Sequence, residues 1–280
     1  MIAPAPLFAG IAREPEYSPG KIEADRAILE ATAAALADRG VRVCLFTAAR
    51  EAAEVGAELY FAMCQGPAAL AELTRIGARG RPVVHDASTI RACRRIETAV
   101  RLERAGIALA RRRPVDTREP SREVLARWFA TCGRGVWVKR GDVHATEPGD
   151  VVRVETPGEA LAVLAGFRRR GIRHALLEEH VEGSTIKFYG VRGVGFFRAY
   201  DESGASISGS QADGWPGLAE KAAAALGLEV FGGDLIVTPS GELVLVDLND
   251  WPSFAPCRDG AARAIADRLL VRWRQAGGRM

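Results

Sequence analysis

Short apolar strands alternate with helix-period segments along the first third of the chain, and this alternation limits the folds that the sequence can adopt. The expected strands are Leu7–Ala12, Val41–Thr47, Glu58–Cys64 and Arg81–His85, and the expected helices are Ile22–Arg39, Pro67–Ala78 and Thr89–Ala105. Strands that are each followed by a helix usually pair in parallel and are covered on both faces. The pattern therefore predicts an α/β region with a parallel sheet.

From Gly135 onward, strands follow one another closely and are joined by short turns. The expected strands are Val136–Lys139, Val151–Val154, Ala175–Glu179, Thr185–Val191, Gly195–Tyr200, Gly233–Thr238 and Glu242–Asn249, and the expected helices are Pro157–Arg170, Gly217–Leu226 and Asp259–Gln275. This arrangement predicts an α+β region with antiparallel pairs. We place a soft boundary near residues 86–115, where Arg111–Pro114 is expected to form a polar turn.

The composition is that of an ordinary globular protein. Hydrophobic residues make up 48% of the chain, charged residues 26%, and the net charge is +3, so neither nucleic acid nor membrane is an expected partner. The five cysteines show no CxxC pair and no metal-ligand spacing, which favours reduced thiols and a cytoplasmic location. Only four of the 38 basic residues are lysines, so each lysine is a mild functional signal.

The strongest chemical motif is the segment from Gly233 to Asn249, which reads as two strands joined at Pro239–Gly241. Because side chains alternate along a strand, Asp247 and Asn249 are expected to share a face with Leu243 and Leu245. A connecting loop of two or four residues puts Asp234 on that face, whereas a loop of three does not. Two carboxylates and an amide oxygen suit Mg²⁺ carrying nucleotide phosphates. The alternative is a hairpin whose acidic residues face water.

Two further segments carry charged residues at strand ends. Lys139 ends an apolar strand, where its ammonium could contact ATP phosphates, although an edge lysine can also extend into water. The apolar strand that ends in Glu178 and Glu179 turns at Gly183 and returns with Lys187, which suits either a nucleotide-binding hinge or a plain β-hairpin.

Taken in their order along the chain, from Lys139 through the Glu178–Lys187 segment to the Gly233–Asn249 hairpin, the three segments resemble the ATP-grasp superfamily over most of the chain. The most specific element is the Asn-x-x-Pro-Ser spacing from Asn249 to Ser253. The resemblance implies an N-terminal α/β domain over residues 1–88. It also implies an ATP-grasp domain over residues 89–280, with the nucleotide between two α+β subdomains.

The resemblance also implies roles for individual residues, with ATP and Mg²⁺ as cofactors. Nucleotide contacts would come from Lys139, Glu178, Glu179, Val181, Glu182 and Lys187, and the Mg²⁺ ligands would be Asp234, Asp247 and Asn249. The chain departs from the family pattern in the helix before the grasp, where Arg95 stands in place of the usual lysine. A second departure is Asp247, where many ligases have Glu.

Most members of this family are carboxylate-amine ligases, and the RimK-like ligases are the relatives that this chain resembles. Arg198 is then a candidate for stabilising the tetrahedral intermediate. A minority are inositol phosphate kinases, which Lys187-Phe188-Tyr189 and His144 also resemble. A catalytically decayed nucleotide-binding protein is the third reading. The expected partner is a small-molecule substrate, and a homodimer through Pro67–Ala78 or the last helix remains open.

Overall fold

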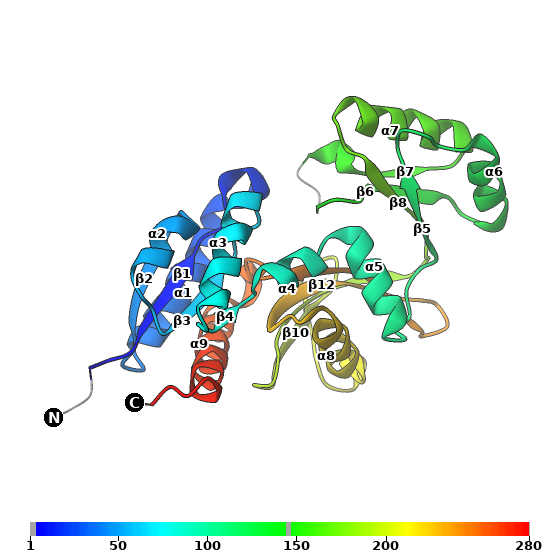
Figure 1. Cartoon of the computed structure of the whole chain (residues 1–280). Helices are drawn as coiled ribbons and strands as arrows, with labels where there is room; N and C mark the ends of the chain where they lie inside the picture. The colour runs from blue at the N-terminus through cyan, green and yellow to red at the C-terminus, as the bar shows by residue number, and fades with distance from the viewer. Residues whose placement is uncertain (1–3, 144–146, 280) are drawn as a thin grey trace.

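The computed structural model describes residues 4–143 and 147–279. Within these residues the strands form three four- or five-stranded sheets, which follow one another along the chain with helices packed against them (Figure 1). The short 3₁₀ turns are Pro15–Tyr17, Pro148–Asp150, Gly209–Ala212 and Ala255–Cys257.

The first sheet has the strand order β2-β1-β3-β4, and all of its pairs are parallel. Its strands are β1 (Leu7–Ile11), β2 (Arg42–Phe46), β3 (Leu59–Ala62) and β4 (Val83–Val84), and the helices around them are α1 (Ile22–Ala37), α2 (Ala49–Glu54) and α3 (Pro67–Ala78). This confirms the α/β region expected from the strand–helix alternation. Helix α2 was not expected from the sequence.

The helix expected over Thr89–Ala105 is broken into α4 (Ala87–Ala92) and α5 (Arg95–Arg104). The break occurs at Arg94, the N-cap of α5, whose backbone is extended with φ of −65° and ψ of 132°. The Thr98 hydroxyl donates to the carbonyl of Ala92 across the break, which ties the end of one helix to the start of the next. The apolar spacing continues across Arg94, so it gives no sign that one helix ends and another begins there.

The second sheet has the order β5-β8-β6-β7 and is antiparallel throughout. Its elements are β5 (Arg112–Asp116), α6 (Arg122–Thr131), β6 (Val136–Arg140), β7 (Val151–Val154), α7 (Pro157–Arg169) and β8 (His174–Glu179). The polar turn expected at Arg111–Pro114 is instead mostly the edge strand β5. Pro114 is tolerated there because an edge strand has a side that needs no amide donor.

The third sheet has the order β11-β10-β9-β12-β13 and is also antiparallel. Its elements are β9 (Ser184–Val191), β10 (Phe196–Tyr200), β11 (Ser206–Ile207), α8 (Trp215–Leu226), β12 (Val230–Val237) and β13 (Leu243–Asp250). One face packs on α8 through a core that includes Phe188, Leu226 and Leu245. The α+β prediction for the second part of the chain is confirmed.

The last helix, α9 (Arg258–Gln275), returns to the first sheet and lies beside α1 (Figure 1). The rings of Trp273 and Phe8 meet edge-on at 5.8 Å, and the Trp273 indole donates to the Glu58 carboxylate. This shared core joins the two ends of the chain and places the carboxyl end of β13 against the carboxyl ends of β1 and β3.

Candidate functional site

Lys187, Asp234 and Asp247 form a row of directly opposed residues across β9, β12 and β13. Residues that lie opposite each other in antiparallel strands present their side chains on the same face of the sheet. The side chains of all three line one cavity of about 310 Å³. The structure therefore brings together one ammonium and two carboxylates that are spread over a stretch of about 60 residues in the sequence.

A β-bulge in β13 produces this alignment. Asp234 pairs with Asp247, but its neighbour Leu235 pairs with Leu245, so Val246 is an extra residue. Five residues, 238–242, connect the paired ends of the two strands. With a connection of five residues and regular pairing, Asp234 and Asp247 would lie on opposite faces of the sheet. The bulge shifts the alternation by one residue and restores them to the same face.

The bulge also corrects one expectation from the sequence. Strict alternation puts Leu245 on the face of Asp247, but Leu245 is fully buried in the core under α8 together with Leu248. Asp247 and Asn249 line the cavity on the other face. The physical reason is the extra residue Val246, which reverses the side-chain direction within the strand.

The arrangement around Asp234 suits a hydrated divalent cation. Burial and then the neighbouring Asp247 charge raise the pKa of Asp234, and the positive charges of Lys187, Lys139 and Lys21 offset this rise only in part. The Asn249 amide donates to Asp247 at 3.1 Å, which leaves the amide oxygen as a neutral ligand beside the two carboxylates. No group of three His, Cys, Asp or Glu side chains with metal-ligand spacing occurs in residues 4–143 and 147–279. Two carboxylates and one amide oxygen fit Mg²⁺ that keeps phosphate and water ligands.

Several segments that are far apart in sequence close the cavity. Besides the row already described, its lining includes Arg13, Tyr17, Ser18, Lys21, Asp25, Arg95, Tyr189, Asn249, Asp250, Pro252 and Ser253. Burial raises the pKa of Tyr189 to about 12, so its hydroxyl keeps its proton at neutral pH. The segment after β1 and the start of α1 thus contribute one wall beside the first sheet, the third sheet contributes the other, and Arg95 and Val151 also line the cavity.

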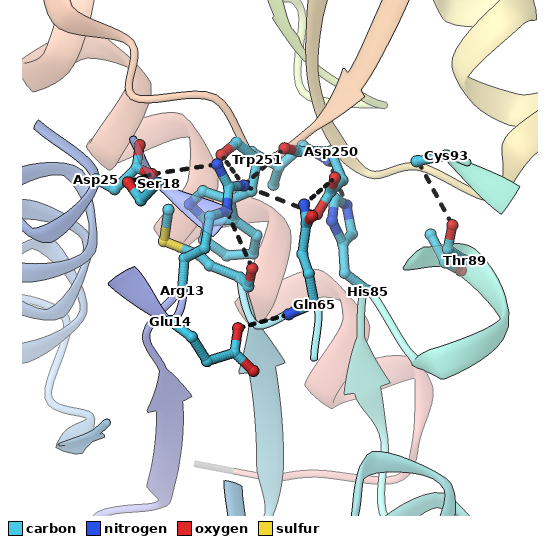
Figure 2. A network of polar contacts seen from close by, with 12 residues as sticks. Arg13, Glu14, Ser18, Asp25, Gln65, His85, Thr89, Cys93, Asp250 and Trp251 are labelled. Carbon is cyan, nitrogen blue, oxygen red and sulfur yellow. Dashed lines mark hydrogen bonds and ion pairs between the residues drawn. The ribbon is translucent and has the colours of Figure 1, made fainter. Parts of the chain in front are cut away.

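Arg13 is the centre of the wall formed by the first sheet (Figure 2). Its guanidinium forms an ion pair with Asp25 at 3.2 Å and lies 3.9 Å from a carboxylate oxygen of Asp250. It also donates to the backbone carbonyls of Asp250 and Trp251. Gln65 binds the other oxygen of Asp250 at 3.0 Å. These contacts fix the end of β13, and with it Asn249, against the first sheet.

Lys139 lies in the second sheet, and its ammonium pairs with Glu178 at 2.6 Å. Both side chains are buried, and Arg112 pairs with the other Glu178 oxygen at 2.7 Å. The Lys139 charge also favours the ionised form of Asp234, against the effect of burial. Lys139 is not among the residues that line the cavity, and Glu178 faces the Lys139 and Arg112 cations instead of open space.

The segment that follows Glu178 connects the second and third sheets. Glu179 forms a bidentate ion pair with Arg111, and Glu182 forms an ion pair with Arg134. Val181 is half-buried between them. These residues are outside the described cavity and lie in the connection between β8 and β9 or beside it.

Three predicted site residues, Arg95, Arg198 and His144, lie outside the row formed by Lys187, Asp234 and Asp247. Arg95 lines the cavity and donates to the Arg140 carbonyl at 3.1 Å. Arg198 is on the same sheet face, opposite Tyr189, but it lines a separate hollow and stacks over the Phe196 ring at 4.9 Å. His144 lies outside the described residues.

Sequence reasoning did not assign a site role to Arg112 or Tyr17. Arg112 is one of 34 arginines in the chain, and it lies in a segment for which the sequence predicts a turn. Tyr17 lies in the short 3₁₀ turn Pro15–Tyr17, which carries no recognised motif. The lysine scarcity that singled out Lys139 and Lys187 offers no help with either residue.

Comparison with known proteins identifies the fold. No family model matches the chain. No curated protein matches its sequence either. Among solved structures, a RimK domain ATP-grasp protein from Sphaerobacter thermophilus is 21% identical, with 94% of this chain and 99% of that chain covered and a TM-score of 0.68.

Two solved ligases are similar over the same extent. The D-alanine-D-alanine ligase from Coxiella burnetii is 14% identical, with 96% and 98% of the two chains covered and a TM-score of 0.70. The VanG D-Ala:D-Ser ligase from Enterococcus faecalis is also 14% identical, with 96% and 99% covered and a TM-score of 0.72. The nearly complete coverage of both chains and the TM-scores near 0.7 show that the chain has the ATP-grasp fold.

Proposed function

We propose that the protein is an ATP- and Mg²⁺-dependent carboxylate-amine ligase that works through an acylphosphate. The fold of solved ATP-grasp ligases supports this reading, as does the row of Lys187, Asp234 and Asp247 in a cavity. The nucleotide would lie between the second and third sheets, with its γ-phosphate at the metal face.

Each residue of the site then has a role set by its position. Asp234, Asp247 and Asn249 would hold Mg²⁺, which neutralises phosphate charge when it is bound. Lys139, Lys187 and Arg95 would contact phosphate oxygens. Val181 and Glu182 border the gap where adenine and ribose would lie, whereas Glu178 and Glu179 orient Lys139 and Arg111.

The charge balance of the cavity is the observation that favours a ligase over a kinase. Its described lining contains four basic side chains, Arg13, Lys21, Arg95 and Lys187, and four carboxylates, Asp25, Asp234, Asp247 and Asp250. Arg13 is already committed to Asp25 and to two backbone carbonyls. An inositol phosphate would require a surplus of cations around several phosphates. A substrate with a single carboxylate needs only one.

In the proposed reaction, a carboxylate oxygen of the first substrate attacks the γ-phosphorus and ADP leaves. The neutral amine of the second substrate then attacks the acylphosphate carbonyl, phosphate leaves, and the nitrogen loses a proton as the amide forms. Such chemistry depends on positioning and charge neutralisation more than on a protein nucleophile. Lys21, which lines the cavity from the side of the first sheet, is placed to bind the acid. Arg198 is a further candidate for stabilising the tetrahedral oxygen.

An ATP-consumption screen tests this proposal. The full chain would be incubated with Mg²⁺-ATP and pools of carboxylates, amines, carboxylate-plus-amine pairs and inositol phosphates, with Asp247→Asn as the control for contaminating ATPase. We expect ADP and phosphate to appear together only when an acid and an amine are both present. ADP formed with an inositol phosphate alone, without free phosphate, would replace the ligase by a kinase. Nucleotide binding without turnover in any pool would identify a decayed enzyme.

A further inference from the structure

The bulge in β13 leaves an unpaired stretch of backbone beside the proposed metal ligands. Val246 has no partner residue on β12, so its carbonyl needs another donor. Arg112 supplies it: the guanidinium donates to the Val246 carbonyl at 2.7 Å and to the Leu245 carbonyl at 3.3 Å. On the other side of Leu245, its amide donates to the Ala108 carbonyl at 3.1 Å. The bulge is thus clamped by residues from outside its own sheet.

The same guanidinium reaches the second sheet. Its Nε atom pairs with Glu178 at 2.7 Å, and the other oxygen of Glu178 pairs with the Lys139 ammonium at 2.6 Å. The side chains of Arg112, Glu178 and Lys139 are 8%, 3% and 8% exposed, so this chain of contacts is shielded from solvent. It links a lysine of the second sheet to the strand of the third sheet that carries Asp247.

We propose that Arg112 is a positioning residue that holds Asp247 in the metal-binding direction and keeps Lys139 in register with it. This inference rests on the proposed nucleotide site and adds a residue to it. Without the bulge, Val246 would take the place of Asp247 opposite Asp234, and the two carboxylates would face opposite sides of the sheet. Arginine suits the task because its planar fork can bind carbonyls and a carboxylate together, which an ammonium cannot do with the same geometry.

The test compares Arg112→Gln and Arg112→Lys with Arg113→Gln, a matched control because Arg113 is the exposed neighbour on the same strand. Binding of the non-hydrolysable analogue AMP-PNP would be measured by calorimetry across a MgCl₂ titration. We expect Arg112→Gln to raise the Mg²⁺ midpoint roughly tenfold, the scale of losing a group that orients a metal ligand. The Mg²⁺ midpoint of Arg112→Lys should lie between those of the wild type and Arg112→Gln. The midpoint of Arg113→Gln should equal that of the wild type. A loss of folded protein alone would lower the bound fraction without moving the midpoint.

Amide hydrogen exchange of the unliganded protein gives a second readout that does not depend on nucleotide. Segment 245–250 should exchange faster in Arg112→Gln than in the wild type, while β9 should be unchanged. If the Mg²⁺ midpoint and the exchange of 245–250 both match those of Arg113→Gln, the inference is wrong. If the wild type binds no AMP-PNP with Mg²⁺, the proposed function fails, and the exchange measurement still decides whether Arg112 holds the bulge. Should Arg112→Gln fail to fold, Arg112→Lys carries both measurements.

Discussion

Asp234 and Asp247 lie directly opposite each other on β12 and β13, and their charges face the same cavity. Burial, followed by repulsion from Asp247, raises the pKa of Asp234 above its ordinary value. Two like charges held this close destabilise the unliganded protein, and a divalent cation would remove that repulsion. The pair therefore links stability, pH and metal binding.

The first prediction concerns the charge of Asp234. Since its folded pKa is raised, the folded state binds this proton more tightly than the unfolded chain, and the contribution to stability falls as pH rises from the ordinary value through the raised pKa. Asp234→Asn should therefore leave thermal stability at pH 7 in EDTA unchanged or higher, and should abolish Mg²⁺-dependent ATP binding. Differential scanning fluorimetry and calorimetry measure the two effects.

The same shift predicts how metal affinity depends on pH. Mg²⁺ binds the deprotonated carboxylate, so the wild type should bind Mg²⁺ more weakly as pH falls toward the raised pKa of Asp234, and binding should release protons. Calorimetry in two buffers with different ionisation enthalpies would detect the released proton. An Mg²⁺ affinity that stays constant from neutral pH down to the ordinary carboxyl range would contradict the metal site.

The third prediction concerns Lys139. Lys139→Ala should weaken ATP binding or turnover by on the order of 3 kcal/mol, about 100-fold, the scale of losing one preorganised charge partner. The loss also leaves Glu178 with Arg112 as its remaining ion-pair partner among the described contacts. Lys221→Ala is the matched control, because Lys221 is an exposed lysine on α8, whereas Lys139 is buried. Equal ATP affinity in the two variants would remove Lys139 from the site.

The fourth prediction tests the wall formed by the first sheet. Arg13→Ala should lower the free energy of unfolding by about 3–5 kcal/mol, since it leaves the buried carboxylates of Asp25 and Asp250 without their cation. Arg26→Ala removes an arginine whose ion pairs are exposed on α1, and should change stability by less than about 0.5 kcal/mol. Urea unfolding of both variants is the measurement. Similar midpoints would show that Arg13 has no such role.

The sequence predicted most of the elements because their periodicity is local. Helix α3 begins and ends where the apolar spacing indicates, and β7 matches its expected bounds. The break at Arg94 and the edge strand β5 were missed because contacts distant in sequence occur at both: Arg95 donates to the Arg140 carbonyl, and Arg112 pairs with Glu178. Periodicity carries no information about such partners.

The site residues were also predicted where the signal is local and missed where it depends on distant partners. The alternation rule correctly grouped Asp247 with Asn249, and the rarity of lysine drew attention to Lys187, which lies opposite Asp234. The rule failed for Leu245 because of the extra residue Val246, whose carbonyl accepts from donors elsewhere in the fold. Arg112, one of those donors, had no local signal that separates it from the other arginines.

The last prediction uses the close approach of β12 to β13. A Cβ atom on Gly233 would lie 2.1 Å from the Asp247 carbonyl oxygen and 2.8 Å from the Phe188 ring, so only glycine fits between the two strands. Gly233→Ala should push the strands apart, lower the free energy of unfolding by roughly 1–3 kcal/mol, and weaken Mg²⁺-dependent AMP-PNP binding because the two carboxylates separate.

Gly77→Ala is the matched control, since Gly77 lies in α3 with open space around the added methyl group. There, alanine should hold stability or raise it by roughly 0.5–1 kcal/mol, because it lowers the entropy of the unfolded chain and favours helix. Urea unfolding and the Mg²⁺ titration would be run on both variants. If Gly233→Ala binds AMP-PNP at the same Mg²⁺ midpoint as Gly77→Ala, the spacing of Asp234 and Asp247 does not control the metal, and the hairpin is not the metal site.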